Sequence, residues 1–357
     1  MPSIRIRRGV ALEIERARPG VVELIVEVEG AKTRAVAYLD LTGPVAPGDR
    51  LILNTGAVAL GLGTGGVHFV IAVEGGPDLD PSSSGHAMKA RYTPSQHAVA
   101  TVEESHAETI DGFDGLGGRA VIVASLHSAL APICVAAKTI DPGARTVYVM
   151  TEGGALPIAF SRSVAELKDR GLLDVTITAG QAFGGDLEAV NKFSALIAAA
   201  TVCDAGLIVA GAGPGNLGTA SRYGFALMEA GELVNAVAAL GGRPIVAPRL
   251  SFADPRERHR GISHHTLTAL GTAALVGAEI ALPPLEPGRR QLVVKQLEDA
   301  RLLELHRLVE VELGDEVEEA LAGSPVRFET MGRAFADDPD CFRSSAASAV
   351  LALRRAP

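Results

Sequence analysis

The first hundred residues carry their hydrophobic positions in short alternating runs that are separated by turns. Residues 21–28 alternate between aliphatic side chains and glutamates, and Pro47-Gly48-Asp49 forms a turn signal ahead of the apolar residues 51–53. A period of two predicts β-strands, and no convincing helical pattern occurs in this stretch. We therefore expect an all-β, barrel-like module over residues 1–110.

From Arg119 onward the pattern changes to aliphatic runs of strand length, separated by stretches long enough for helices. This alternation is typical of βα units around a parallel sheet whose two faces are covered. The predicted strands are residues 120–124, 146–150, 175–178, 206–210, 244–247 and 278–282, and the predicted helices are residues 132–140, 158–172, 187–202, 227–240 and 266–276. We expect a doubly wound, mostly parallel α/β domain over residues 119–285, after a glycine-rich linker at residues 111–118.

The chain becomes more charged beyond Pro283-Pro284. Two weak strands are predicted at residues 308–311 and 326–328, with a helix after Asp338. We assign residues 286–357 to a C-terminal α/β extension. The predicted fold class is therefore α/β, in which an N-terminal all-β barrel-like module precedes a doubly wound α/β domain.

Net charge and aromatic content argue against nucleic acid as a partner. The chain of 357 residues has 33 Lys and Arg against 42 Asp and Glu, a net charge of −9, which argues against binding to a phosphate backbone. With no Trp, 4 Tyr and 10 Phe it also offers few platforms for stacking bases. We expect a globular protein with no nucleic-acid partner.

Targeting and cysteine signals are weak. The first fifteen residues alternate between charged and apolar side chains, which differs from a signal peptide, and no run approaches the roughly 18 apolar residues of a membrane span. Three widely spaced cysteines do not make a disulfide framework. We expect a cytoplasmic protein with no membrane partner, and a symmetric homodimer is the common state for a chain of this type.

Polar residues gather directly after the predicted parallel strands, where open α/β sheets bind their ligands. Gly213, Gly215 and Gly218 have the spacing of a dinucleotide-binding loop. The match departs from that fingerprint in three ways: it follows the fourth strand, Pro214 occupies the turn, and no acidic residue ends a strand about 20 residues later. A loop that presents backbone amides to some other anion, and a purely conformational role for the glycines, both stay open.

The segment from Arg249 to His265 is unusually basic for an acidic protein. If Ser263 caps the following helix, the helix dipole favours neutral imidazole in its first turn, where it could act as a base, an electrophile or a metal ligand. Adjacent histidines on a helix point about 100° apart, so we do not expect both to bind one metal. A solvated arginine-rich loop is the alternative. The candidate residues here are Arg249, Asp254, Arg256, Arg258, His259, His264 and His265.

Two more candidates lie elsewhere in the α/β domain. His127 follows the first predicted strand, and either a catalytic role or a backbone-bonded loop histidine fits its position. Asp186 opens the predicted helix at 187–202, which also suits an N-cap. Together with Asp254 and either His264 or His265, these residues could supply ligands for a divalent metal, but their spacing identifies neither the metal nor its ligands.

These observations predict an enzyme that acts on an anionic small molecule, phosphorylated molecules included, at the carboxyl ends of the parallel strands. The three glycines, the arginines, His259 and His265 would bind the ligand, and His127, His264, Asp186 and Asp254 would be catalytic. A metal-assisted hydrolase is a variant of this hypothesis. The competing hypothesis is a metabolite-sensing or regulatory protein that binds the same ligand without turnover.

Several longer motifs resemble a known family. They include KARYTP at residues 89–94, SLHS at 125–128, AFGGDLEAVN at 182–191, SFADPRERHRG at 251–261, SHHT at 263–266 and TMGR at 330–333. Together they resemble the bacterial family named domain of unknown function 3866, over nearly the whole chain. That name implies no activity, so the resemblance transfers no catalytic residue.

Overall fold

The computed structural model describes residues 3–63, 65–81, 85–219 and 221–354. The chain divides into two compact units, Met1–Ala100 and Thr101–Pro357. Each unit has its own hydrophobic core.

The first unit is built around a closed five-stranded barrel. Its strands are β1 (Ile6–Arg18), β2 (Val21–Val28), β3 (Ala31–Tyr38), β4 (Arg50–Asn54) and β5 (Val67–Val73), in the order β1-β2-β3-β5-β4. Only β3 and β5 pair in parallel. The alternation along β2 places Leu24 and Val26 in the barrel core, while Glu27 is exposed. The predicted all-β, barrel-like module is confirmed.

Short elements complete this part of the chain. They are α1 (Leu39–Thr42), α2 (Gly56–Ala59), the hairpin β6 (Ala87–Lys89) and β7 (His97–Val99), and then α3 (Val102–Ser105) and α4 (Ala107–Asp111). The expectation of no helix here is therefore wrong. Each helix has only four or five residues, too few for a 3.6-residue hydrophobic period to show in the sequence.

The second unit holds an eight-stranded sheet, all of whose pairs are parallel. Its order is β11-β10-β9-β12-β8-β13-β16-β17. The strands are β8 (Ala120–Ala124), β9 (Thr146–Thr151), β10 (Val175–Ala179), β11 (Leu187–Ala189), β12 (Leu207–Ala212), β13 (Arg243–Ala247), β16 (Glu279–Leu282) and β17 (Arg307–Glu310).

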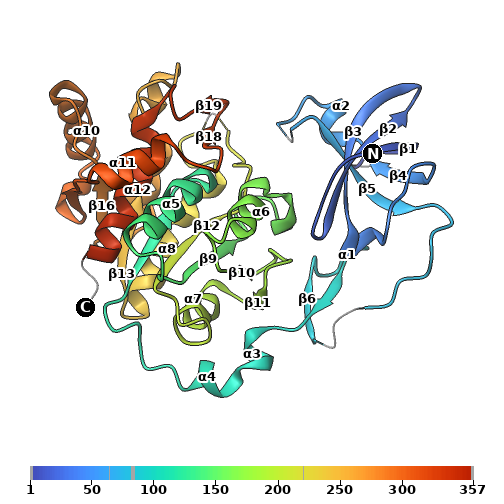
Figure 1. Ribbon diagram of the computed structural model, residues 1–357, viewed down its shortest axis with the longest axis horizontal. Helices are drawn as coiled ribbons and strands as arrows, with labels where there is room; N and C mark the ends of the chain where they lie inside the picture. Colours follow the sequence, from blue (N-terminus) through green and yellow to red (C-terminus); the bar gives the residue numbers. More distant parts are fainter. Residues whose placement is uncertain (1–2, 64, 82–84, 220, 355–357) are drawn as a thin grey trace. The chain divides into compact units, whose positions relative to one another are not determined.

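Helices cover both faces of the sheet, as doubly wound folds require. Alternate residues of β8 belong to different cores: Val121 and Val123 to one, Ile122 and Ala124 to the other. The first core contains α7 (Lys192–Thr201), α8 (Glu229–Ala239), α9 (His264–Thr272) and α10 (Pro287–Asp299). The second contains α5 (Leu130–Ile140), α6 (Arg162–Asp169), α11 (Asp315–Ala322) and α12 (Pro339–Arg354), of which α5, α11 and α12 lie side by side in Figure 1.

The strand order places a switch point between β8 and β12. After β8 the chain passes through α5 to β9 on one side, whereas after β12 it passes through α8 to β13 on the other side. Ligands of open α/β sheets bind at the carboxyl ends of the strands at such a point.

The structure differs from the sequence-based expectation in three places. Residues 187–202 form β11 and then α7, because the side chain of Asn191 caps a helix that begins at Lys192. Residues 326–328 are irregular, and β18 (Glu329–Thr330) follows them to pair with β19 (Arg333–Ala334). The helices α10 and α11 were not predicted, since α10 buries only Val293 and Leu297.

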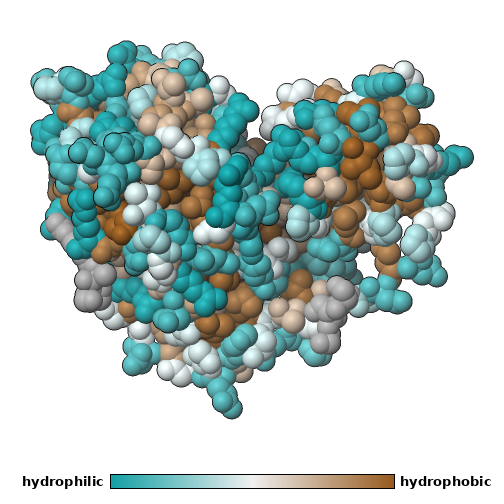
Figure 2. All heavy atoms as spheres, in the orientation of Figure 1, coloured by the Kyte–Doolittle hydropathy of each residue, from teal (hydrophilic) through white to brown (hydrophobic). Residues whose placement is uncertain are grey.

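The surface of the molecule is mixed. Figure 2 shows hydrophilic residues over much of one face, with apolar residues on the barrel unit, where Ile4, Ile6 and Leu60 are among the exposed hydrophobic residues. Among the described residues, no helix combines the length and apolar character that crossing a membrane requires.

Candidate functional site

Three loops leave the carboxyl ends of β8, β12 and β13 and surround the switch point. The loop after β13 carries a two-residue hairpin of β14 (Leu250–Ser251) and β15 (Gly261–Ile262), and it leads directly into α9. Ser263 is the N-cap of α9, with its Oγ accepting a hydrogen bond from the His265 backbone N at 3.3 Å. The predicted cap therefore exists, and it places His264 and His265 in the first helical turn.

Three histidines meet at this helix start. His259, His264 and His265 each offer one ring nitrogen, and these three atoms lie within 4.8 Å of one another. The ring centroids of His264 and His265 are 4.2 Å apart, and that of His259 lies 4.9 and 5.1 Å from them. The expected divergence of the two adjacent rings does not occur, because side-chain rotation brings both rings to the same side.

All three imidazoles are neutral near pH 7. Burial, followed by the charges of Arg249 and Arg256, lowers the pKa of His259 to about 3. Burial also lowers the pKa of His265 to about 4, and it lowers the pKa of His264, with Arg258 as the next cause.

Neighbouring side chains hold the rings in place. Phe225 stacks on His265 with ring centroids 4.1 Å apart and an interplanar angle of 14°. The Nδ1 of His259 lies 2.7 Å from Ser263 Oγ, and Asn216 Nδ2 lies 3.4 Å from His265 Nδ1. By contrast, the Nε2 of His264 is buried and has no hydrogen-bond partner among the described residues.

An ion cluster centred on Asp254 lies in the same loop. The side chain of Asp254 is 0% exposed, and its oxygens pair with Arg249 at 3.1 Å, with Arg256 at 2.9 Å and with Arg333 at 3.3 Å. These bonds, above all that from Arg256, hold the pKa of Asp254 well below its usual range. Asp254 therefore organises the arginines, and its oxygens are already engaged.

Arg258 differs from these arginines. It is exposed, and it makes no hydrogen bond or ion pair with any residue that the structure describes. Arg260, two residues later, is equally exposed and unpaired, but its charge is not among the causes of any histidine shift. Arg258 is thus an exposed cation without a partner among the described residues, and its charge helps to lower the pKa of His264 and of His265.

His127 lies at the carboxyl end of β8 in a closed network. Its Nδ1 is 3.1 Å from Tyr148 Oη and its Nε2 is 2.7 Å from Ser161 Oγ, while Tyr148 Oη donates to the Ala212 carbonyl at 2.8 Å. Burial lowers the pKa of His127 to about 4. Both ring nitrogens are engaged, so the network joins β8, β9, β12 and the start of α6.

Asp186 lies at the opposite edge of the sheet. Its Oδ2 accepts from the backbone N and the Oγ1 of Thr176, both at 2.8 Å, at the amino-terminal end of β10, and it also pairs with Lys168. It does not cap a helix, because the chain forms β11 here and Asn191 takes that role. The structure therefore does not bring Asp186 together with the histidines.

The glycine loop does not have the surroundings of a dinucleotide site. The next long helix, α8, begins at Glu229, well after Gly218, so no helix N-terminus follows the glycines directly. Gly213 instead packs closely on the loop after β9, since a Cβ there would lie 2.7 Å from the Ala155 carbonyl. Gly218 lies beside His265, whose ring carbon would be 3.7 Å from an added Cβ.

The sequence analysis did not propose four further residues as site residues. Phe225, Asn216 and Arg333 come from segments far from residues 249–265 in the chain, so no local spacing links them. Glu229 lies at the start of α8, where its carboxylate accepts a hydrogen bond from Thr151 and burial raises its pKa. The signal available for Arg333 was its place in the TMGR motif.

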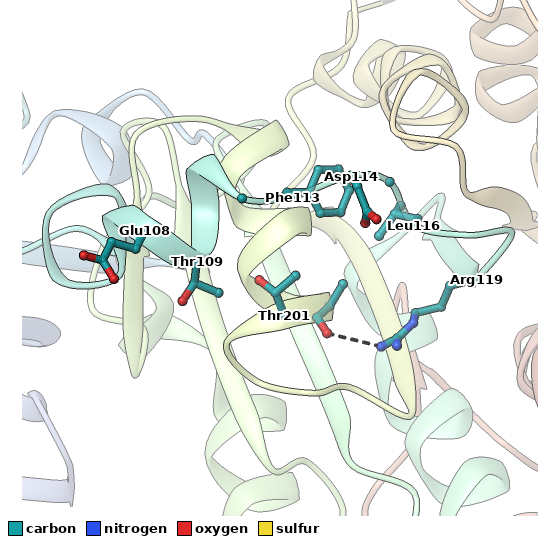
Figure 3. Close-up of a pocket in the computed structure, with 10 residues that line it drawn as sticks. Glu108, Thr109, Phe113, Asp114, Leu116, Arg119 and Thr201 are labelled. Carbon is teal, nitrogen blue, oxygen red and sulfur yellow. Dashed lines mark hydrogen bonds between the residues drawn. The ribbon is translucent and has the colours of Figure 1, made fainter.

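Cavity volume does not locate this site. A cavity of about 380 Å³ opens at the amino-terminal edge of the sheet, where Arg119 donates to the Ala200 carbonyl at 3.4 Å (Figure 3) and also to the Ala205 carbonyl at 2.7 Å. Asp114 and Thr109 also line it, but none of the predicted site residues does. The predicted site residues gather instead at the carboxyl-terminal edge, where His265 and the buried Ser125 line only a small packing gap without room for a water molecule.

Comparison with known families completes the description. The model of the family described as "Protein of unknown function (DUF3866)" matches residues 34–349. The chain belongs to this family. In this DUF3866 protein the match spans β3 to most of α12, and so includes the histidines and the arginine cluster. No curated protein and no solved structure matches the chain.

Proposed function

We propose that this DUF3866 protein is an enzyme that acts on a small anionic molecule at the carboxyl ends of β8, β12 and β13. The observation that carries the proposal is the loop after β13, which gathers three neutral imidazoles at the switch point of the sheet and carries the exposed Arg258, unpaired among the described residues, directly before His259. A cation for binding and a neutral base for proton transfer are the two parts that such a reaction needs.

Local charge supports an anionic ligand. In the ion cluster, three guanidiniums (Arg249, Arg256 and Arg333) face two carboxylates (Asp254 and Asp338), which leaves one positive charge. Arg258 adds a second positive charge. In a chain whose net charge is −9, this local excess attracts and orients an anion.

His264 is the best-placed base. Its Nε2 is buried and lacks a hydrogen-bond partner within the described part of the chain, so no interaction within the fold engages its lone pair. His127 and Asp254 have their polar atoms engaged within the fold, and Asp186 lies at the other edge. We therefore assign proton transfer to His264, and assign the other three residues to the support of the fold.

The test is turnover of a panel of phosphate monoesters, phosphodiesters and carboxylate-bearing esters by the purified full chain. We expect one class to turn over, with kcat/KM reduced at least tenfold in Arg258→Gln and unchanged in the matched control Arg260→Gln. Anion binding without turnover would instead support the sensor hypothesis. Equal loss in both variants would contradict the assignment of Arg258.

A further inference from the structure

The three histidines have the composition of a metal site. They supply three imidazole nitrogens and no carboxylate, a set that suits Zn²⁺ and other divalent transition metals and does not suit Mg²⁺ or Ca²⁺. Zn–N bonds of about 2.0–2.1 Å in a tetrahedron place ligand nitrogens roughly 3.4 Å apart. The three nitrogens lie within 4.8 Å of one another, so to reach that spacing they must approach by no more than about 1.4 Å.

The surroundings orient the nitrogens as metal ligands require. When His259 Nδ1 donates to Ser263 Oγ at 2.7 Å, the lone pair of Nε2 remains free for a metal. Rotating the Asn216 amide by 180° lets its oxygen accept from His265 Nδ1 in the same way, since the two amide ends are interchangeable in shape. Stacking on Phe225 then fixes the plane of the His265 ring.

His264 provides an independent observation. Its Nε2 is buried without a hydrogen-bond partner among the described residues, and such a group costs about 1–3 kcal/mol when it stays unsatisfied. A metal ion at the centre of the three rings would satisfy this nitrogen. His306 is a contrasting structural histidine. Its Nδ1 accepts a hydrogen bond from the Ala278 backbone N at 3.2 Å, so that ring nitrogen is satisfied within the fold.

We propose that His259, His264 and His265 bind one divalent transition-metal ion of the Zn²⁺ class and leave a fourth coordination position open. Three protein ligands with one open position are typical of catalytic zinc, whereas structural zinc sites have four protein ligands. This proposal goes beyond the proposed function, because the ion can bind whatever the substrate is.

If the proposed function also holds, the metal occupies the Nε2 of His264, so a metal-bound water takes the place of that imidazole in proton transfer, and the reaction class is hydrolysis. Such a metal would supply a water molecule of lowered pKa, whose hydroxide form would attack the phosphorus or the carbonyl carbon of the ester. The bond to the leaving-group oxygen breaks, and that oxygen takes up a proton from solvent. Arg258 would hold the anionic group next to the metal-bound hydroxide.

The arginines near the three histidines should weaken metal binding unless an anion binds as well. Positive charge opposes the binding of a cation, and Arg258 is the member of the cluster without a paired carboxylate among the described residues. An anion bound between Arg258 and the metal removes that repulsion. Metal and inorganic phosphate should therefore each increase the affinity for the other by the same factor.

The experiment is Zn²⁺ titration of the chelator-treated full chain, followed by calorimetry and by native mass spectrometry, with and without inorganic phosphate. We expect one Zn²⁺ per chain, an affinity at least tenfold lower in His264→Ala and in His259→Gln, and unchanged affinity in the control His106→Ala, with circular dichroism confirming the fold. Co²⁺ in place of Zn²⁺ should give the visible absorption of a tetrahedral site in the wild type and in His106→Ala, and not in His264→Ala or His259→Gln.

Two results would overturn the metal site: wild-type protein that binds Zn²⁺ no more tightly than His264→Ala, or an equal loss in His106→Ala. The outcome is separate from that of the proposed function. If the protein binds one Zn²⁺ per chain and Arg258→Gln does not change turnover, the metal site is supported and the anion site is contradicted. If Arg258→Gln reduces turnover and the protein binds no Zn²⁺, the anion site is supported and the metal site is contradicted.

Discussion

The side chain of Asp254 shows how one buried charge arranges a site. It is 0% exposed and contacts three guanidiniums, each from a different position along the chain. A buried charge is tolerated only when it is paired, and here the pairing also ties the loop after β13 to the C-terminal hairpin through Arg333. The carboxylate therefore contributes to geometry and does not need to take part in chemistry.

Replacing Asp254 with Asn tests this role. The amide cannot balance three guanidiniums, so we expect the free energy of unfolding to fall by about 3 kcal/mol or more in urea denaturation. The control is Asp186→Asn, whose partner Lys168 is one-third exposed and whose loss should cost less. A smaller effect for Asp254 than for Asp186 would show that the cluster is not organised as described.

His127 predicts a pH dependence of stability. Its pKa is about 4 in the fold against an ordinary value near 6.5, so between these values the unfolded chain binds the extra proton. Its stabilising contribution is fully present above pH 6.5 and is lost as the pH falls toward 4. In His127→Asn, the slope of stability against pH in this window should decrease by up to roughly 1.4 kcal/mol per pH unit. Identical slopes in the two proteins would contradict the neutral, buried imidazole.

The sequence predicted part of the site because its residues are close in the chain. The candidates from Arg249 to His265 fall on one loop and one helix start, and the structure brings them together. Asn216 and Phe225 could not be found in this way, since only the folded loop after β12 places them beside His265. Asp186 was misplaced because an N-cap and a strand edge have the same local sequence pattern.

At the scale of the elements, the loops after β9 and β12 are in direct backbone contact. A Cβ on Gly154 would lie 2.2 Å from the Gly213 carbonyl oxygen, and the Ala155 backbone N donates to the Pro214 carbonyl at 2.8 Å. The neighbouring strands β9 and β12 therefore carry loops that approach each other too closely for a side chain at that contact.

Gly154→Ala should accordingly displace both loops. We expect a loss of about 1–3 kcal/mol in the free energy of unfolding, since the clash is with backbone and no flexible side chain can move away. Gly288→Ala is the control, because nothing lies within 4 Å of a Cβ there and helix α10 would favour alanine. A Gly154→Ala protein as stable as the wild type would contradict the close packing of these loops.

The strands of the sheet were more predictable than the helices. Strands such as β8 and β12 are buried on both faces, so their sequences are continuous aliphatic runs bounded by turns. The prediction of one helix over residues 187–202 was wrong because a three-residue strand and a helix of similar apolar composition follow each other there. Short strands and helices carry too few residues for a period to be measured.

At the scale of the whole molecule, the two units have separate hydrophobic cores, which predicts that the second unit can fold without the first. The barrel core is formed by residues between Ala11 and Val73, and the two cores of the sheet by residues from Val102 onward. We expect residues 101–357 to fold alone, with the helical and strand content of the second unit by circular dichroism, and to keep one Zn²⁺ site. An unfolded fragment would show that the sheet depends on the barrel.

We propose that the protein binds its ligand at the carboxyl ends of β8, β12 and β13. The most direct test is the anomalous diffraction of crystals that contain tungstate, an oxyanion similar in charge and shape to phosphate. The account predicts a tungsten peak in contact with the Arg258 guanidinium and beside the histidine rings, which disappears in Arg258→Gln crystals. A peak found only elsewhere, such as at the Arg119 cavity, would contradict it.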